Sequence, residues 1–261
     1  MRRELDEKEL FALIKNESPA GGETTARLGP GRLFHGWAAR KQLWMLAYWP
    51  VYGALFFALE RLRRPAQYHV MHTEVDDWIP FCEGFVIPYV FWFLFLIGIH
   101  CYTAKHDAAA FKRLMAFVAI SHTCALAIFF LFPTCQHLRP LAFERQNLLT
   151  QITAFFYRID TSTNVCPSLH VVGSMAVWYA ARDAGLFSHR GCRVFFSAAT
   201  VLICLSTVFL KQHSVLDVAA GLLLSDLVYR LVYRPVRGGY PSTAERWKAR
   251  WQERRRTLRR T

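Results

Sequence analysis

Four long stretches of this chain contain no Asp, Glu, Lys or Arg, and they constrain its fold more than any other feature. They cover residues 43–59, 84–104, 114–133 and 194–210. At a rise of about 1.5 Å per residue, helices of this length approach the roughly 30 Å thickness of a bilayer core. A soluble helix would show a polar face at every turn, and the second and third stretches show none. These stretches therefore predict transmembrane helices.

Two further stretches complete the predicted bundle. Residues 167–181 form a shorter apolar run, and residues 213–233 form one that includes three charged side chains. The predicted fold is therefore all-α, with six transmembrane helices in a membrane domain at residues 40–235. Residues 1–39 are predicted to be a cytoplasmic segment, and residues 236–261 a basic, amphipathic cytoplasmic tail.

The formal net charge of +13 is explained by membrane orientation, because the basic residues flank the apolar stretches. With a cytoplasmic N-terminus, 25 of the 32 Lys and Arg residues fall in cytoplasmic segments, although Arg61, Arg63 and Arg64 do not. Trp247 and Trp251 lie one turn apart in the basic tail, which predicts a helix resting on anionic lipids. No nucleic-acid partner is expected, since no base-reading motif is present. The basic termini and the absence of a cleavable apolar leader suit a bacterial inner membrane.

Titratable residues beside membrane spans are costly to place there and are functional candidates. His213 and Asp217 are four residues apart, so they share one face if the last helix begins by residue 213. The carboxylate then orients one imidazole nitrogen and leaves the other free as a nucleophile or base. Lys211, just before them, supplies a cation for phosphate oxygens.

A second cluster lies at the start of the fourth predicted span. Pro167 suits the first turn of a helix, whose free amides attract anions. Ser168 adds a hydroxyl donor, and His170 is placed to protonate a leaving group. Arg139 and Arg158, in the preceding loop, fall on the same side of the membrane as both clusters. Together these residues predict a phosphate site on the face opposite the two termini.

No cofactor is expected for this site. The chain has no second carboxylate cluster of the kind that holds Mg²⁺. A zinc ion held by His170, His213 and Asp217 is a chemically possible alternative. Lys211 and Arg139 would oppose a bound cation, so the prediction is a site without a metal.

Residues 167–170 (Pro-Ser-Leu-His) resemble the Pro-Ser-x-His motif of the type-2 phosphatidic acid phosphatase superfamily. Residues 206–217, which include His-x-x-x-Asp, are similar to the last motif of that family. Arg139 and Pro140 resemble the end of its first motif. The order of these motifs and their position in loops match as well, and the resemblance covers roughly residues 40–235.

This resemblance implies a six-helix fold and a phosphohistidine mechanism without a metal. In that mechanism His213 is the nucleophile, Asp217 orients it, and His170 protonates the leaving group and later activates water. The phosphoryl oxygens are expected to be held by Lys211, Arg139 and Ser168.

Two departures from the family pattern matter. The first motif normally has a Lys seven residues before its Arg, and this chain has Phe132 there, with Arg158 or Arg145 as replacements. Lys211 stands where the family has Arg, and it lacks the bidentate fork of a guanidinium. In both departures the chain resembles the branch of the family that contains inositol-phosphorylceramide and sphingomyelin synthases. Enzymes of that branch move a head group between lipids.

The predicted function is hydrolysis of a phosphomonoester on a lipid phosphate at the extracytoplasmic membrane face. The alternative is a lipid head-group phosphotransferase that uses the same nucleophile. A second alternative is a membrane protein that binds an anion or a lipid without turnover. A disulfide between Cys135 and Cys166, both in the third loop, is left open.

Overall fold

The structure is a computed structural model that describes residues 41–63, 65 and 67–234. Most of this part of the chain is helical, and its only strands are two short ones of two residues each. The predicted all-α class is therefore supported. The predicted cytoplasmic segments 1–39 and 236–261 lie outside the described residues.

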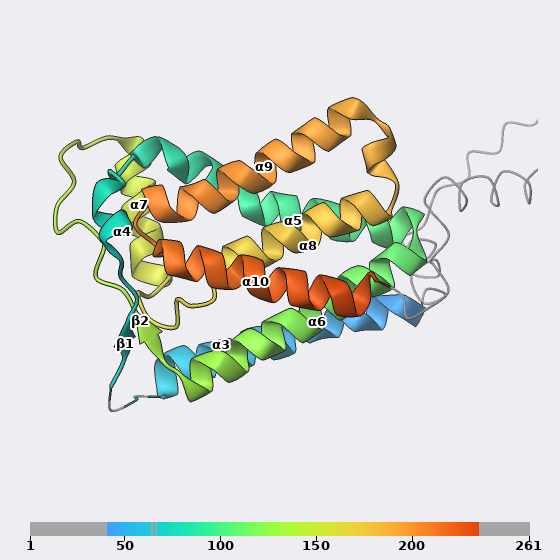
Figure 1. Cartoon of the computed structure of the whole chain (residues 1–261), viewed down its shortest axis with the longest axis horizontal. Coiled ribbons are helices and arrows are strands. Elements are labelled where there is room, and N and C mark those ends of the chain that lie inside the picture. The colour runs from blue at the N-terminus through green and yellow to red at the C-terminus, as the bar shows by residue number, and fades with distance from the viewer. Residues whose placement is uncertain (1–40, 64, 66, 235–261) are drawn as a thin grey trace, which may run out of the picture. The chain divides into compact units, whose positions relative to one another are not determined.

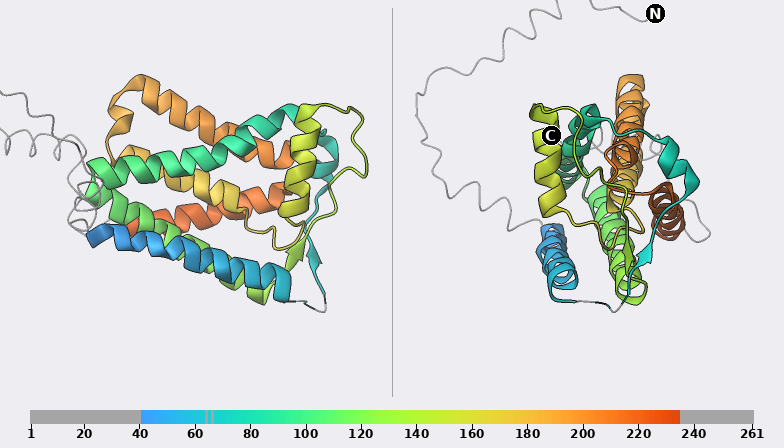
Figure 2. Two further views of the ribbon diagram at one scale, coloured as in Figure 1. Left: turned by 180° about the vertical axis from the view of Figure 1, so that it is seen from behind. Right: turned by 90° about the vertical axis from the view of Figure 1, so that its left-hand side faces the viewer.

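Long helices run side by side as an up-and-down bundle (Figures 1 and 2). Because the helices alternate in direction, the C-terminal end of the first helix lies at the same end of the bundle as the N-terminal ends of the second, fourth and sixth helices. In chain order they are α3 (Tyr48–Leu62, preceded by the 3-10 helix η1, Lys41–Ala47), α5 (Val86–His106), α6 (Ala108–Leu131), α8 (Leu169–Asp183), α9 (Arg190–Phe209) and α10 (Val215–Val232).

Polar side chains set the boundaries of these helices. Asp107 is the single residue between α5 and α6, and its carboxylate accepts hydrogen bonds from the amides of Ala109 and Ala110 at 3.1 and 3.0 Å. Ser214 caps α10 in the same way, since its hydroxyl accepts a hydrogen bond from the amide of Leu216. Such caps satisfy amides that have no partner within the helix.

In the part of the chain that the structure describes, four helices are long and apolar enough to cross a membrane: Lys41–Leu62, Glu83–His106, Ala108–Leu131 and Arg190–Phe209. The two other long helices differ from them in length or composition. Helix α8 has 15 residues, which span only about 22 Å at 1.5 Å per residue. Helix α10 has 18 residues, three of them charged.

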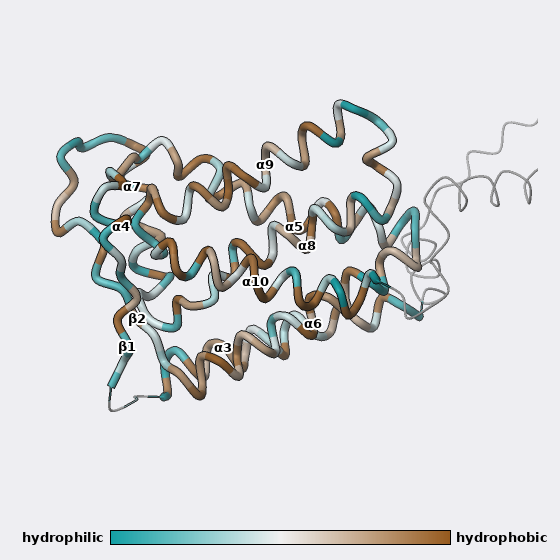
Figure 3. Tube along the Cα trace, in the orientation of Figure 1, coloured by the Kyte–Doolittle hydropathy of each residue, from teal (hydrophilic) through white to brown (hydrophobic). Residues whose placement is uncertain are grey.

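The outward faces of the bundle carry large apolar side chains. Figure 3 shows hydrophobic residues along the helices and hydrophilic residues gathered at the ends and loops. A soluble monomer rarely exposes so extensive an apolar surface, so this surface fits a lipid environment. Exposed examples on four helices are Val51, Leu55 and Phe57 on α3, Ile87, Leu94 and Ile97 on α5, Val201 and Leu202 on α9, and Leu223, Leu227 and Leu231 on α10.

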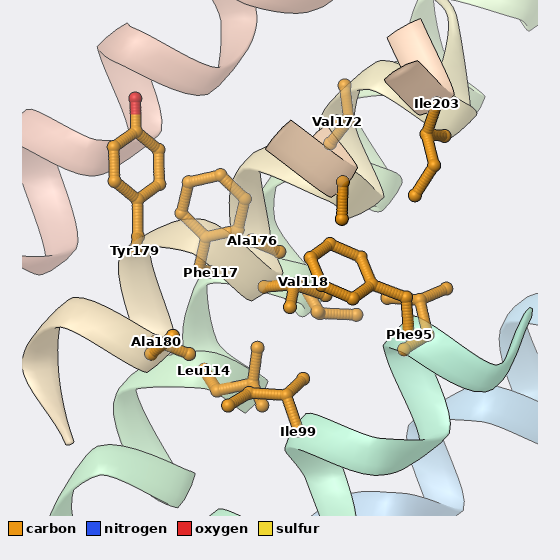
Figure 4. Packing of buried hydrophobic residues seen from close by; sticks show 14 of the residues in the cluster. Phe95, Ile99, Leu114, Phe117, Val118, Val172, Ala176, Tyr179, Ala180 and Ile203 are labelled. Atoms are coloured by element: carbon orange, nitrogen blue, oxygen red, sulfur yellow. The ribbon is translucent and has the colours of Figure 1, made fainter. Parts of the chain in front are cut away.

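Helix α8 lies at the centre of the bundle and packs against α5, α6, α9 and α10. Ten of its fifteen residues are buried, and many of these are small. Figure 4 shows the core that results, in which Val172 and Ala176 of α8 meet Phe95 of α5 and Val118 of α6. Because α8 is surrounded by other helices, it needs little lipid-facing apolar surface of its own.

Short elements cover one end of the bundle. They are α4 (Glu74–Trp78), the 3-10 helix η2 (Glu83–Phe85), α7 (Leu148–Ile159), and strands β1 (His69–Val70) and β2 (Thr134–Cys135). The strands pair in parallel, with His69 opposite Thr134, an interaction that the sequence did not predict. A further 3-10 helix, η3 (Leu186–Ser188), links α8 to α9 at the opposite end.

Candidate active site

His213 lies in the turn just before α10, Asp217 lies in the first turn of that helix, and the two side chains contact each other. The imidazole Nδ1 of His213 is 3.3 Å from Oδ2 of Asp217, and the same oxygen accepts a hydrogen bond from the Ser214 amide at 2.9 Å. The Asp217 side chain is fully buried. The carboxylate therefore holds the Nδ1 edge of the imidazole and leaves Nε2 of His213 as the available nitrogen.

His170, in the first turn of α8, faces this pair. The ring centroids of His170 and His213 are 6.0 Å apart. Two aromatic rings from α5 fix the orientation of His170: Tyr89 stacks on it at 4.4 Å and Trp92 lies tilted at 4.5 Å. The Nε2 atom of His170 is buried and has no hydrogen-bond partner among the described residues.

Close packing of α8 against α10 brings the two imidazoles together. The Ser168 amide donates a hydrogen bond to the backbone carbonyl of Asp217 at 3.0 Å. Gly221 makes this approach possible, because a Cβ there would lie 3.0 Å from the Ser168 carbonyl and 3.1 Å from Cβ of Val171. The side chain of Ser168 is fully buried, and its hydroxyl has no partner among the described residues.

The two imidazoles share a pocket of about 280 Å³. Its lining combines aromatic and aliphatic side chains with polar ones. None of the lining side chains is a Lys or Arg. The lining residues are Phe56, Tyr89, Trp92, Phe93, Phe156, Ile159, Asp160, Thr161, Thr163, Asn164, Val165, Leu169, His170, Gln212 and His213.

No protein-family model, curated protein or solved structure matches this chain. Among the residues that the structure describes, no group of three His, Cys, Asp or Glu side chains is arranged to hold a metal ion.

Arg139, a predicted phosphate ligand, donates its hydrogen bonds to protein oxygens. Its guanidinium donates to the carbonyls of Tyr157, Asp160 and Thr161 at 3.0, 2.8 and 3.1 Å, and also to the Gln212 side chain. It lies over the Tyr157 ring at 4.5 Å, and it does not line the pocket. Burial lowers the pKa of Arg139, and the neighbouring Asp160 carboxylate opposes that shift. In this arrangement Arg139 joins α7 to the turn before α10.

Lys211 also lies away from the two imidazoles. Its backbone is left-handed, with φ of 54°, a conformation that non-glycine residues rarely adopt. Its ammonium donates a hydrogen bond to the backbone carbonyl of Asp76 at 2.6 Å. It lines a second pocket of about 420 Å³ together with His72 and His137. Burial lowers the pKa of Lys211, and the nearby Asp76 and Asp77 carboxylates oppose that shift.

The other cationic candidates also lie outside the lining of the His170–His213 pocket. Arg158 is exposed on α7. Arg145 lies 3.4 Å from the carboxylate of Glu83. Phe132, which stands where the family has Lys, stacks on the ring of His69 at 3.9 Å. The structure thus brings together His170, His213 and Asp217, and it places the predicted cations around this site rather than in it.

Asp76 carries no site prediction from the sequence. Its carboxylate is buried and accepts hydrogen bonds from the Ser214 hydroxyl at 2.6 Å and the Val215 amide at 2.9 Å. The available signal was Thr73-x-x-Asp76, a capping-box pattern that forms here at the start of α4. Tyr89 and Trp92 were also missed, because aromatic residues in an apolar run carry no sequence signal of a site.

Cys135 and Cys166 are both free thiols in this structure. Cys135 is buried beside β1, whereas Cys166 precedes α8. Burial, together with the nearby Asp217 carboxylate, raises the pKa of Cys166 to about 12. Its thiol is therefore protonated at neutral pH and is a poor nucleophile.

Proposed function

We propose that this chain is an integral membrane enzyme that moves a phosphoryl group of a lipid through a phosphohistidine on His213. The observation that carries the proposal is the opposed pair of imidazoles, one held by Asp217 and the other unpartnered at Nε2. Their ring centroids lie 6.0 Å apart, and both rings line the same pocket. A phosphoryl group bound in that pocket would lie beside both imidazoles.

The first step forms a covalent intermediate. Nε2 of His213 attacks phosphorus, an N–P bond forms, and the P–O bond to the lipid alcohol breaks. His170, in its protonated form, gives its proton to the leaving oxygen. The Asp217 carboxylate stabilises the positive charge that develops on the His213 ring.

The second step discharges the intermediate. Neutral His170 accepts a proton from a water molecule as the water oxygen attacks phosphorus and the N–P bond breaks. Inorganic phosphate leaves, and both imidazoles return to their starting states. This sequence makes the enzyme a phosphatase that hydrolyses the phosphomonoester of a lipid phosphate.

Head-group transfer to a lipid alcohol is a second candidate, and the composition of the pocket favours it. A phosphomonoester carries between one and two negative charges near neutral pH, yet the pocket lining contains Asp160 and no Lys or Arg. A phosphodiester carries only one negative charge and suits this lining better. In this reaction a lipid alcohol replaces water in the second step.

Trapping the phosphoenzyme tests the proposal. The purified full chain is incubated with a lipid labelled at phosphorus, quenched in alkali, and analysed for phosphohistidine. We expect label on the wild-type chain and on neither His213→Ala nor His213→Gln. Incubating the phosphoenzyme in buffer with or without a diacylglycerol then separates the two reactions. Hydrolysis releases the label in buffer alone, whereas transfer needs the diacylglycerol. Equal turnover in His213→Ala and wild type would favour the binding-protein alternative.

The proposed topology has six membrane spans, with both termini cytoplasmic and the site extracytoplasmic in a bacterial inner membrane. Support comes from the exposed apolar residues of α10 and from the central place of α8. The basic tail would then face anionic lipids of the inner leaflet. An impermeant thiol reagent should label Arg145→Cys in intact cells but label Arg190→Cys only after lysis. The reverse pattern would overturn this orientation.

A further inference from the structure

Residues 161–166 lie between α7 and α8 and form part of the lining of the His170–His213 pocket. Strand β2 holds this segment, because the Thr134 carbonyl accepts a hydrogen bond from the Asn164 backbone amide at 2.6 Å. The Glu60 carboxylate, at the end of α3, holds it as well. It accepts hydrogen bonds from the Thr163 hydroxyl at 3.1 Å, from the Thr161 hydroxyl and from the Asn164 side-chain amide. Two separate elements therefore fix this part of the pocket.

Glu60 also determines the orientation of the Asn164 side chain. An ionised carboxylate only accepts hydrogen bonds, so the NH₂ group of the Asn164 amide is the group that meets it. The other end of the amide, Oδ1, is buried and has no hydrogen-bond partner among the described residues. The whole of Asn164 is only 7% exposed. A buried acceptor without a donor is costly, and in an active site it indicates a ligand that supplies the donor.

A second acceptor of this kind lines the same pocket. Nε2 of His170 is also buried without a partner among the described residues, and Asn164, His170 and His213 all contribute to the lining. When the phosphohistidine on His213 is discharged, neutral His170 accepts one proton from the attacking molecule. A water molecule has two O–H bonds, so it can serve both acceptors at once. A lipid alcohol has a single O–H bond, and His170 alone uses it.

We propose that Asn164 is a further catalytic residue, which orients the attacking water, and that Glu60 is its positioning residue. The inference rests on the proposed function, and it assigns water rather than a lipid alcohol as the acceptor of the phosphoryl group. The water oxygen forms a bond to phosphorus, the N–P bond breaks, and its electron pair returns to Nε2 of His213. One water proton passes to Nε2 of His170. The other hydrogen stays on the oxygen and is hydrogen-bonded to Oδ1 of Asn164.

Asn164→Gly tests this role, because the backbone of Asn164 is left-handed, with φ of 52°, and Gly adopts this conformation without strain. The purified full chain in detergent is labelled from a lipid phosphate, and phosphoenzyme formation and discharge are followed by rapid quench. Discharge is measured in buffer and with added methanol, whose single O–H bond offers no second hydrogen. We expect formation within about threefold of wild type, and a ratio of methyl phosphate to inorganic phosphate raised about tenfold or more.

Glu60→Gln tests the positioning role. A Gln side chain donates as well as accepts, so the Asn164 amide is no longer held in one orientation. This change should slow discharge by water about threefold or more, and it should not alter the product ratio further in Asn164→Gly. Gln146→Gly is the matched control, since Gln146 is an exposed side-chain amide in the loop before α7. It should change neither rate by more than about twofold.

An unchanged product ratio in Asn164→Gly, with normal labelling, would overturn the role of Asn164 and leave the proposed function standing. Equal slowing of formation and discharge would also overturn it, because that result indicates a residue that only shapes the pocket. A further change of the ratio when Glu60→Gln is added to Asn164→Gly would overturn the positioning role of Glu60. If no phosphoenzyme forms on the wild type, the proposed function itself fails, and the inference fails with it.

Discussion

The Asp76 carboxylate reaches the first turn of α10, where it accepts hydrogen bonds from the Ser214 hydroxyl at 2.6 Å and the Val215 amide at 2.9 Å. The two elements are far apart in sequence. Asp76 nevertheless satisfies backbone and side-chain donors beside the residues that hold His213. The short helix α4 thus fixes the start of α10, directly after the candidate nucleophile His213.

Replacing Asp76 with Ala should destabilise the protein by roughly 1–3 kcal/mol, because buried donors lose a charged acceptor. Burial alone raises the pKa of Asp76, but hydrogen bonds from Ser214, Val215 and Thr73 together lower it below its ordinary value. The stabilisation is therefore present above the unfolded-state pKa and is lost as the pH falls through the lower folded-state pKa.

Denaturant unfolding in detergent, followed from neutral pH to about pH 3, measures this effect. The stability difference between wild type and Asp76→Ala should shrink at the acid end. Asp77→Ala serves as the control, since its carboxylate is exposed and pairs with His72 rather than with α10. Equal loss in both variants would contradict a specific cap on α10.

Asp217→Asn should lower kcat by about 10²–10⁴-fold, in the range of a positioned acid–base partner. The amide keeps the shape of the side chain but cannot stabilise the imidazolium that forms on His213. Single-turnover kinetics of phosphoenzyme formation measures the loss directly. Asp226→Asn is the control, because Asp226 pairs with Arg230 near the other end of α10. A loss below tenfold would argue against the pairing as a catalytic device.

Gly173→Ala should impair His170 without touching it. A Cβ at residue 173 would lie 2.8 Å from the Trp92 ring, which in turn lies against His170. Displacing the indole frees the imidazole to rotate, so kcat should fall at least about tenfold with a smaller change in KM. Trp92→Phe in the Gly173→Ala background relieves the overlap and should restore part of the rate. Unchanged kcat in Gly173→Ala would show that Trp92 does not position His170.

Arg139→Ala should lower the free energy of unfolding by roughly 1.5–3 kcal/mol, as expected for lost hydrogen bonds from a charged group. The guanidinium joins three carbonyls and Gln212, so the segment from α7 to α8 should also exchange amide hydrogens faster. Arg158→Ala, which alters an exposed side chain on the same helix end, should change stability by less than about 0.5 kcal/mol. A raised KM with no loss of stability would instead identify Arg139 as a substrate ligand.

The sequence predicted those features that depend on uncharged stretches or on the spacing of residues close together in the chain. Uncharged stretches marked four of the long helices, and the four-residue spacing of Asp226 and Arg230 places them on one face of α10, where they form an ion pair at 2.6 Å. The spacing of His213 and Asp217 likewise anticipated their contact. Helix α10 begins at Val215, however, so His213 reaches Asp217 from the turn before the helix and not from the same helix face. Both contacts join residues four apart in the chain, which is why a sequence can indicate them.

The positions of Lys211 and Arg139 could not be predicted in this way. The direction of Lys211 depends on its left-handed backbone and on a carbonyl of α4. That of Arg139 depends on carbonyls at the end of α7. Both are set by tertiary contacts between loops, for which a sequence carries no periodic signal. The Glu60 contacts with residues 161–164 escaped prediction for the same reason.

The enclosure of α8 has a consequence for how the proposed membrane bundle assembles during synthesis. This helix is short, carries His170 and Ser174, and is almost wholly covered by its neighbours. Alone in a bilayer it would expose these polar groups to hydrocarbon, at a cost that α5 and α6 remove once they are in place. Translocon assays should therefore find α8 inserted efficiently only behind α5 and α6, and poorly when fused alone to a reporter. If α8 inserts efficiently on its own, its insertion does not require α5 and α6, and these helices pack around it afterwards.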